Sequence, residues 1–284
     1  MNSTKQFVIT ALLAFTALFT ARAANVSDTL YIDGSVGRLY TIVDRPADTT
    51  RRVPVVILCH GFSGNCNAWL MQCLSQNLLE RGMATVRFDF NGHGNSDGEF
   101  KNMTVLNEIA DLKAVIAWAE QQPWAKDIAL VGHSQGGVVV GMTSGELGKK
   151  IVKAEVLLAP AAVLRDDALK GNTMGAFYDP WNFNDEYIRL PFSPESGPLL
   201  LGKDYIKSAI TLPIYETSAR YKGPALIIQG TYDRIVPYTY AERYRDVIRK
   251  STLRLITGED HGFSQTTPET SVQVADWLRS ILIK

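Results

Sequence analysis

The chain has 284 residues, of which 46% are hydrophobic and 20% are charged, and 29 basic residues balance 29 acidic ones. This length and composition suit one large globular domain and exclude a predominantly disordered chain. The formal net charge of zero lacks the basic excess that nucleic acid or an anionic membrane would favour, so we expect neither as a partner.

The first segment has the features of an export signal. Lys5 makes the start of the chain positively charged, and the run from Phe7 to Phe19 is apolar apart from two threonines. Ala21-Arg22-Ala23 then places small residues at the two positions that signal peptidase recognises. The apolar run is short for a membrane span, which favours a cleaved signal peptide. The alternative is an uncleaved membrane anchor. We therefore predict a signal peptide over residues 1–23, a mature domain over residues 24–284, and a secreted or periplasmic location.

Strand and helix patterns alternate along the rest of the chain. The strand patterns begin with an expected antiparallel pair and continue as apolar runs typical of strands buried on both faces. They lie at Leu30–Ile32, Leu39–Val43, Val55–Cys59, Ala84–Phe88, Ile128–Val131, Val156–Leu158, Ala225–Ile228 and Leu253–Ile256. The clear helical patterns lie at Val105–Glu120, Val138–Leu147, Tyr240–Lys250 and Glu269–Ile283. This alternation predicts an α/β protein with a mostly parallel central sheet and helices on both faces.

One segment, at about 164–212, interrupts the alternation. It has no buried-strand run and is rich in glycine, proline and aromatic residues. It is too long for a plain connection within a compact domain. We expect a lid subdomain inserted over the carboxyl-terminal edge of the sheet. An ordinary excursion with its own small core is the alternative, and the aromatic residues suit either interpretation.

The cysteine count is odd in the mature chain, which holds Cys59, Cys66 and Cys73. At least one thiol is therefore unpaired within a monomer. If Cys66 and Cys73 share one helix, their separation of two turns, about 10 Å, is too long for a disulfide. We expect three buried free thiols.

The run Gly132-His133-Ser134-Gln135-Gly136 matches the pattern G-x-S-x-G. It follows an expected strand and precedes an expected helix, which is the context of a nucleophile elbow. A serine hydroxyl needs a neighbouring base to become a useful nucleophile. We predict Ser134 as the nucleophile, and we expect the His133 side chain to point away from the reaction.

The base and the acid should follow the nucleophile in chain order, with the base last. His261 follows the last expected strand, and Asp233 follows the expected strand that ends at Ile228. We therefore predict His261 as the base and Asp233 as the acid that orients it. Glu259 and Asp260 are close to the histidine in sequence and are expected to be solvated loop charges.

A tetrahedral intermediate requires two backbone N–H donors. One should be the N–H of Gln135, directly after the nucleophile, and the other should come from the loop after the strand that ends at Cys59. That loop begins His60-Gly61-Phe62, and we predict Phe62 as the second donor. This chemistry requires no metal and no cofactor, and we expect none.

The sequence resembles the microbial cinnamoyl and feruloyl esterases of the α/β-hydrolase fold over nearly the whole mature chain. The resemblance is carried by His60-Gly61-Phe62, Gly132–Gly137, Leu157–Ala162, Asp167–Leu169, Gly171–Thr173, Leu212–Glu216, Asp233 and Asp260–Ser264. It implies a secreted serine carboxylesterase that cleaves hydroxycinnamoyl esters, either small or linked to a saccharide as in plant cell walls, through a Ser-His-Asp acyl-enzyme mechanism.

In such esterases the insert is a lid that holds the aromatic acyl group. By this resemblance Asp167 and Tyr205 are candidates to contact the phenolic hydroxyls, whereas Met174 stands where relatives are expected to have a polar glutamine. An acetyl or short-chain esterase, or another serine hydrolase on the same fold, is the first alternative. A non-catalytic binding protein is the second. The sequence does not indicate an oligomeric state.

Overall fold

The computed structural model describes residues 25–47, 51–191 and 198–283, so the predicted signal peptide, residues 1–23, lies outside the described residues. Eight strands of this part of the chain form one sheet. They are β1 (Asn25–Asp33), β2 (Arg38–Pro46), β3 (Val53–Cys59), β4 (Ala84–Phe88), β5 (Ala125–His133), β6 (Val152–Leu158), β11 (Ala225–Gly230) and β12 (Ser251–Ile256).

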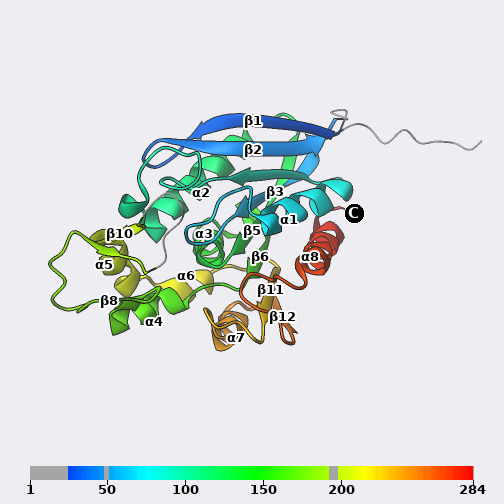
Figure 1. The fold of residues 1–284 in the computed structure, drawn as a ribbon. Helices are drawn as coiled ribbons and strands as arrows, with labels where there is room; N and C mark the ends of the chain where they lie inside the picture. The colour runs from blue at the N-terminus through cyan, green and yellow to red at the C-terminus, as the bar shows by residue number, and fades with distance from the viewer. Residues whose placement is uncertain (1–24, 48–50, 192–197, 284) are drawn as a thin grey trace, which may run out of the picture.

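The strands are ordered β1-β2-β4-β3-β5-β6-β11-β12 across the sheet (Figure 1). Only β2 runs antiparallel to its neighbours, β1 and β4, and all other pairs are parallel. The prediction of a mostly parallel sheet with an antiparallel opening pair is therefore confirmed. Parallel strands bring their carboxyl ends to one edge of a sheet, and this edge carries the loops that begin after β3, β5, β11 and β12.

Helices cover both faces of the sheet, as predicted. They are α1 (Trp69–Glu80), α2 (Val105–Glu120), α3 (Gln135–Ile151), α4 (Val163–Lys170), α5 (Lys203–Thr211), α6 (Ile214–Ser218), α7 (Thr239–Val247) and α8 (Thr267–Leu282), with a short 3-10 helix at Phe100–Asn102. One apolar core joins α1 and α8 to the sheet. The other core joins α2, α3 and α7 to the opposite face and extends into α5 and α6.

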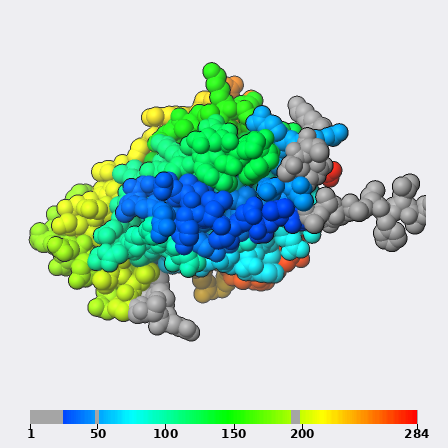
Figure 2. Space-filling model, turned by 90° about the horizontal axis from the view of Figure 1, so that it is seen from above, coloured from blue at the N-terminus to red at the C-terminus, as the bar shows by residue number. Residues whose placement is uncertain are grey.

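The segment predicted as an insert leaves the sheet after β6 and projects from one side of the molecule (Figures 1 and 2). Besides α4 and α5 it contains two short antiparallel pairs, β7 (Asn172–Thr173) with β8 (Ala176–Phe177) and β9 (Tyr187–Arg189) with β10 (Leu200–Gly202). Buried side chains such as Ile188, Leu201 and Ile206 join it to the core of α2 and α3. We call residues 163–190 together with residues 199–212 the lid.

Two expectations about elements were wrong or incomplete. The strand β12 was expected to be buried on both faces, but it is the edge strand of the sheet, and Thr252 and Leu255 are exposed. The helix α1 was not among the predicted helices, although Leu70, Leu74 and Leu78 form its buried face. No described helix has the length and apolar character needed to cross a bilayer.

All three cysteines are buried free thiols, as predicted. Burial raises the pKa of Cys59 well above its ordinary value and raises the pKa of Cys66 to about 12. A thiol with a raised pKa is a poor nucleophile at neutral pH. The cysteines are therefore core residues, and the chemistry must be sought elsewhere.

Candidate active site

Ser134 lies at the sharp turn between β5 and α3. Its φ of +55° is in the region that non-glycine residues seldom adopt. A side chain at Gly132 would come within 2.1 Å of the Gly136 carbonyl oxygen, and one at Gly136 would come within 2.4 Å of the His60 carbonyl oxygen. The strained turn therefore requires glycine on both sides of the serine, which explains the local sequence pattern.

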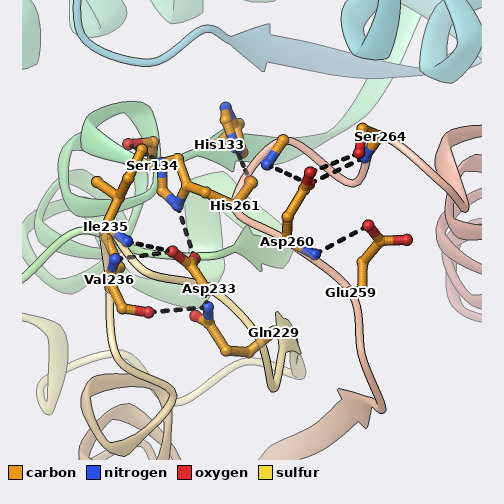
Figure 3. Close-up of polar contacts among 11 residues, drawn as sticks. His133, Ser134, Gln229, Asp233, Ile235, Val236, Glu259, Asp260, His261 and Ser264 are labelled. Atoms are coloured by element: carbon orange, nitrogen blue, oxygen red, sulfur yellow. Dashed lines mark hydrogen bonds and ion pairs between the residues drawn. The ribbon is translucent and has the colours of Figure 1, made fainter.

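The structure brings Ser134, His261 and Asp233 together in one hydrogen-bonded row (Figure 3). The Ser134 hydroxyl lies 2.9 Å from His261 Nε2, and His261 Nδ1 lies 2.7 Å from Asp233 Oδ2. Because an ionised carboxylate only accepts hydrogen bonds, Nδ1 carries the proton and Nε2 is free to accept from the serine. This arrangement can take a proton from Ser134 as its oxygen attacks an electrophile.

Asp233 is held by a complete set of donors. Its Oδ1 accepts from the N–H groups of Ile235 and Val236 at 2.9 and 2.8 Å, and its Oδ2 accepts from Gln229 Nε2 at 2.7 Å besides His261. Burial alone would raise the pKa of Asp233, but its hydrogen bonds and the nearby His261 lower that pKa below its ordinary value. The carboxylate is therefore ionised and fixed in orientation. Gln229, on β11, was not identified from the sequence.

The loop that carries His261 is fixed by residues whose roles differ from expectation. His133 does not simply point away, because its Nε2 donates to the His261 carbonyl oxygen at 2.8 Å. Burial lowers the pKa of His133 to about 4, so its ring is neutral at neutral pH. Glu259, expected to be a solvated charge, is buried, and its Oε1 accepts from the N–H of Asp260. The inward-facing Glu259 carboxylate therefore holds the backbone of the loop after β12.

Asp260 does not contact the His261 ring, in agreement with its exclusion as the acid. It accepts hydrogen bonds from the N–H groups of Gly262 and Ser264 at 3.0 Å and from the Ser264 hydroxyl. The Ser264 hydroxyl is the largest cause of the lowered pKa of Asp260. This carboxylate shapes the turn after the histidine.

The two predicted oxyanion donors, Phe62 and Gln135, line the same pocket as Ser134. Among the described residues, neither of their backbone N–H groups has a hydrogen-bond acceptor. Buried backbone N–H groups are nearly always paired. Two unpaired donors beside a nucleophilic hydroxyl are suited to accept the charge of a developing oxyanion.

The pocket above Ser134 has a volume of about 540 Å³, the size of a small-molecule site. Sheet loops supply Phe62, Ile235 and His261 to its wall, and the lid supplies Leu164, Asp167 and Tyr205. Met174 also lines it, so the position expected to be polar in relatives offers a thioether here. The walls are mainly apolar, and few groups can contact a polar atom of a ligand.

Both predicted substrate-binding residues line this pocket, but their polar groups differ in availability. Asp167 is half-buried, and burial raises the pKa of its carboxyl group. The Tyr205 hydroxyl already donates to Gln135 Oε1 at 2.7 Å, so its proton is engaged within the protein. Asp167 is therefore the freer of the two to contact a ligand hydroxyl.

No cluster of three or more potential metal ligands occurs within residues 25–47, 51–191 and 198–283. The titratable groups nearest Ser134 are used in the row and in its supporting loops. The residues present can thus perform proton transfer and nucleophilic attack with the groups already described.

The chain is similar in sequence and structure to known hydrolases. A family model described as serine aminopeptidase, S33, matches residues 50–179, and a model described as TAP-like protein matches residues 205–281. Among solved structures, the chain is similar to Est1E from Butyrivibrio proteoclasticus with ferulic acid bound, at 28% identity and a TM-score of 0.83. The superposition covers 90% of this chain and 100% of Est1E.

Curated relatives match over shorter stretches. An uncharacterized 31.7 kDa protein of Escherichia coli from the traX-finO intergenic region is 33% identical over 45% of this chain, and a second match is 42% identical over 30%. These matches span 46% and 30% of the relatives' own length. The mitochondrial palmitoyl-protein thioesterase ABHD10 of Mus musculus is 26% identical over 69% of this chain and 64% of its own length.

The chain has the α/β-hydrolase fold, because its sheet order and its structural neighbours agree. The family models and the similarity to Est1E together support a serine hydrolase or esterase on this fold.

Proposed function

We propose that the protein is a serine carboxylesterase that hydrolyses hydroxycinnamoyl esters of the feruloyl type. The observation that carries the proposal is the hydrogen-bonded row of Ser134, His261 and Asp233 beneath a pocket walled by the lid. The chemistry follows from that row, and the choice of acyl group follows from the pocket.

In the first half of the reaction, His261 takes the proton of Ser134 as the serine oxygen attacks the ester carbonyl. The N–H groups of Gln135 and Phe62 hold the resulting oxyanion. His261 then gives its proton to the departing sugar or alcohol oxygen, leaving the acyl group on Ser134. Asp233 stays ionised and keeps the imidazole in the tautomer that the step needs.

In the second half, a water molecule takes the place of the alcohol. His261 accepts a proton from this water as its oxygen attacks the acyl-enzyme, and the same two N–H groups hold the second oxyanion. Collapse of that intermediate returns the proton to Ser134 and releases the hydroxycinnamic acid. All proton transfers pass through one imidazole.

Three observations support an aromatic acyl group. The pocket of about 540 Å³ is large and mainly apolar, which suits a planar ring. Asp167 reaches it from the lid as a half-buried carboxyl group that could pair with a phenolic hydroxyl. Est1E, a protein similar to this chain along its whole length, binds ferulic acid.

The substrate class is tested by comparing kcat/KM for methyl ferulate, methyl caffeate and methyl acetate, which share one leaving group, and for a palmitoyl thioester. A buried polar group left without its partner costs about 1–3 kcal/mol, so we expect the hydroxycinnamates to lead by about tenfold or more. Preference for the acetate would indicate a general short-chain esterase. Preference for the palmitoyl thioester would place the activity with that of the ABHD10 relative.

The alternative of a non-catalytic binding protein is tested by covalent labelling. A fluorophosphonate reacts with a serine only when a base and an oxyanion site activate it. We expect stoichiometric labelling of Ser134, located by peptide mass spectrometry. An unlabelled, correctly folded protein would reject the enzymatic function.

We also propose that the protein is exported after cleavage near Ala23, so that it meets esters of cell-wall saccharides outside the cytoplasm. The proposal rests on the charged start and apolar run of residues 1–23. N-terminal sequencing of the protein from its native source should begin near Ala24. Retention of Met1 on the recovered protein would contradict export by this route.

A further inference from the structure

Tyr205, on the lid helix α5, contacts both residues that we assign as oxyanion donors. Its hydroxyl donates to Gln135 Oε1 at 2.7 Å. Its ring packs edge-on against the Phe62 ring, with centroids 5.9 Å apart. Tyr205 is only 2% exposed, so its side chain is almost wholly shielded from bulk solvent. A single lid residue therefore braces both halves of the proposed oxyanion hole.

The Gln135 amide is held from its other end by Glu108 of α2. Gln135 Nε2 donates to Glu108 Oε2 at 2.8 Å and also contacts Met103 Sδ at 3.5 Å. Glu108 is 1% exposed and Gln135 is 2% exposed. An amide with both ends bonded in a buried network has one orientation. Because Gln135 directly follows Ser134, a fixed side chain also restrains the backbone N–H that faces the pocket.

The ionisation state of Glu108 matters for this arrangement. Burial raises its pKa to about 8, the Gln135 hydrogen bond opposes the rise, and the Asp111 carboxyl adds to it. The other groups that interact with it are the Cys59 thiol of β3 and the Tyr205 phenol, whose pKa values burial also raises. Glu108 is therefore neutral at pH 7. Its ionisation would place a negative charge beside the residue that must hold an oxyanion.

We propose that Glu108 and Tyr205 are positioning residues that hold Gln135 and Phe62 in the geometry that oxyanion stabilisation requires. The lid helix α5 then takes part in catalysis of every ester, and not only in the choice of acyl group. The inference rests on the proposed function, because it assumes that these two N–H groups serve Ser134. The Tyr205 hydroxyl is thereby assigned to the support of Gln135, in place of the recognition of the substrate ring that the sequence suggested.

The test measures the rate constant for phosphonylation of Ser134 by a fluorophosphonate between pH 6 and 9.5. This reaction requires the oxyanion site but does not require the acyl pocket. In the wild type, ionisation of a group with a pKa of about 8 should lower this rate constant about tenfold between pH 7 and pH 9. In Glu108→Gln, which keeps an acceptor for Gln135 but cannot ionise, the alkaline fall should disappear. A wild-type rate constant that stays level to pH 9.5 would overturn the proposal even if the variant failed to fold.

Glu155→Gln provides a matched control. Glu155, on β6, is likewise buried with a pKa raised to about 8, but it makes no hydrogen bond to Gln135. Each raised pKa lies above the ordinary glutamate value of 4.5. The contribution of each group to the stability of the folded protein is therefore greatest below pH 4.5 and is lost as the pH rises through 8. Both substitutions should therefore reduce the fall in Tm between pH 5 and pH 9. Only Glu108→Gln should alter the labelling profile.

Tyr205→Phe keeps the ring against Phe62 and removes only the hydrogen bond to Gln135. Removing an oxyanion donor costs about 10²- to 10³-fold, so loosening one should cost about tenfold, at every pH and for ferulate and acetate esters alike. A loss confined to ferulate, or an alkaline fall that persists in Glu108→Gln, would overturn the positioning role. A wild type that is not labelled at any pH would instead reject the proposed function itself.

Discussion

The loops at the carboxyl ends of β5, β11 and β12 face the same pocket as the lid, but the two regions are built differently. In the loops, the side chains of Ser134, His261 and Asp233 have fixed partners, and Asp233 alone accepts four hydrogen bonds. In the lid, the strands have only two or three residues, and Phe177 and Trp181 are 81% and 77% exposed.

This difference indicates a division of labour with one point of contact. Loops on a rigid sheet can hold reacting groups in a fixed geometry, while a loosely built insertion can change its lining without disturbing them. Tyr205 is the exception, because it belongs to the lid and contacts Gln135 and Phe62. The following predictions test the division, beginning with the largest effect.

Removing the nucleophile should abolish catalysis, which the loops perform, and should preserve ligand binding, to which the lid contributes. Ser134→Ala should lower kcat by about 10⁴- to 10⁶-fold, because covalent catalysis is lost while the oxyanion donors remain. Equilibrium binding of ferulic acid should stay close to wild type, since the pocket wall is unchanged. Near wild-type turnover by the purified variant would rule out Ser134 as the nucleophile.

Removing the acid should have an effect almost as large. Asp233→Asn should fold normally and lose about 10⁴-fold in kcat, because an amide favours the wrong histidine tautomer. Asp260→Asn is the matched control on the neighbouring loop and should cost little, since Asp260 contacts only the turn at residues 262–264. If the two kcat losses were exchanged, the assignment of the acid would be wrong.

A smaller loss of kcat is expected on substitution of His133, which donates a hydrogen bond to the backbone carbonyl of the catalytic histidine. His133→Phe keeps a ring but removes the donor to the His261 carbonyl, and a displaced base should lower kcat by about ten- to a hundredfold. His133→Gln can still donate from a nitrogen of similar reach and should retain more of the activity. Equal kcat values for wild type and His133→Phe would show that this hydrogen bond has no positioning role.

Much of the sheet could be predicted because its strands are continuous apolar runs, and the nucleophile could be predicted because its turn requires glycines at fixed spacing. The helix α1 was missed because its apolar positions are not preceded by a side-chain cap, its N-cap being Ala68. The edge position of β12 was missed because an apolar run does not indicate how many neighbours a strand has.

The contacts of the supporting residues could not be predicted because the partners are distant in sequence. Gln135 and Tyr205 are 70 positions apart, Gln135 and Glu108 are 27 apart, and His133 and His261 are 128 apart. At Glu108 the sequence signal is only a polar residue within the apolar pattern of the buried face of α2. Such a residue indicates a buried partner without identifying it.

The most direct test of the division of labour is the ratio of kcat/KM for methyl ferulate to kcat/KM for p-nitrophenyl acetate, measured in wild type, Asp233→Asn and Asp167→Ala. The triad acts on both esters in the same way, so Asp233→Asn should lower both values and leave their ratio unchanged. Asp167→Ala removes the proposed partner of the phenolic hydroxyl, so it should lower the ratio about tenfold while acetate turnover stays near wild type. Equal losses on the two esters in Asp167→Ala, with the ratio unchanged, would contradict the assignment of acyl-group choice to the lid.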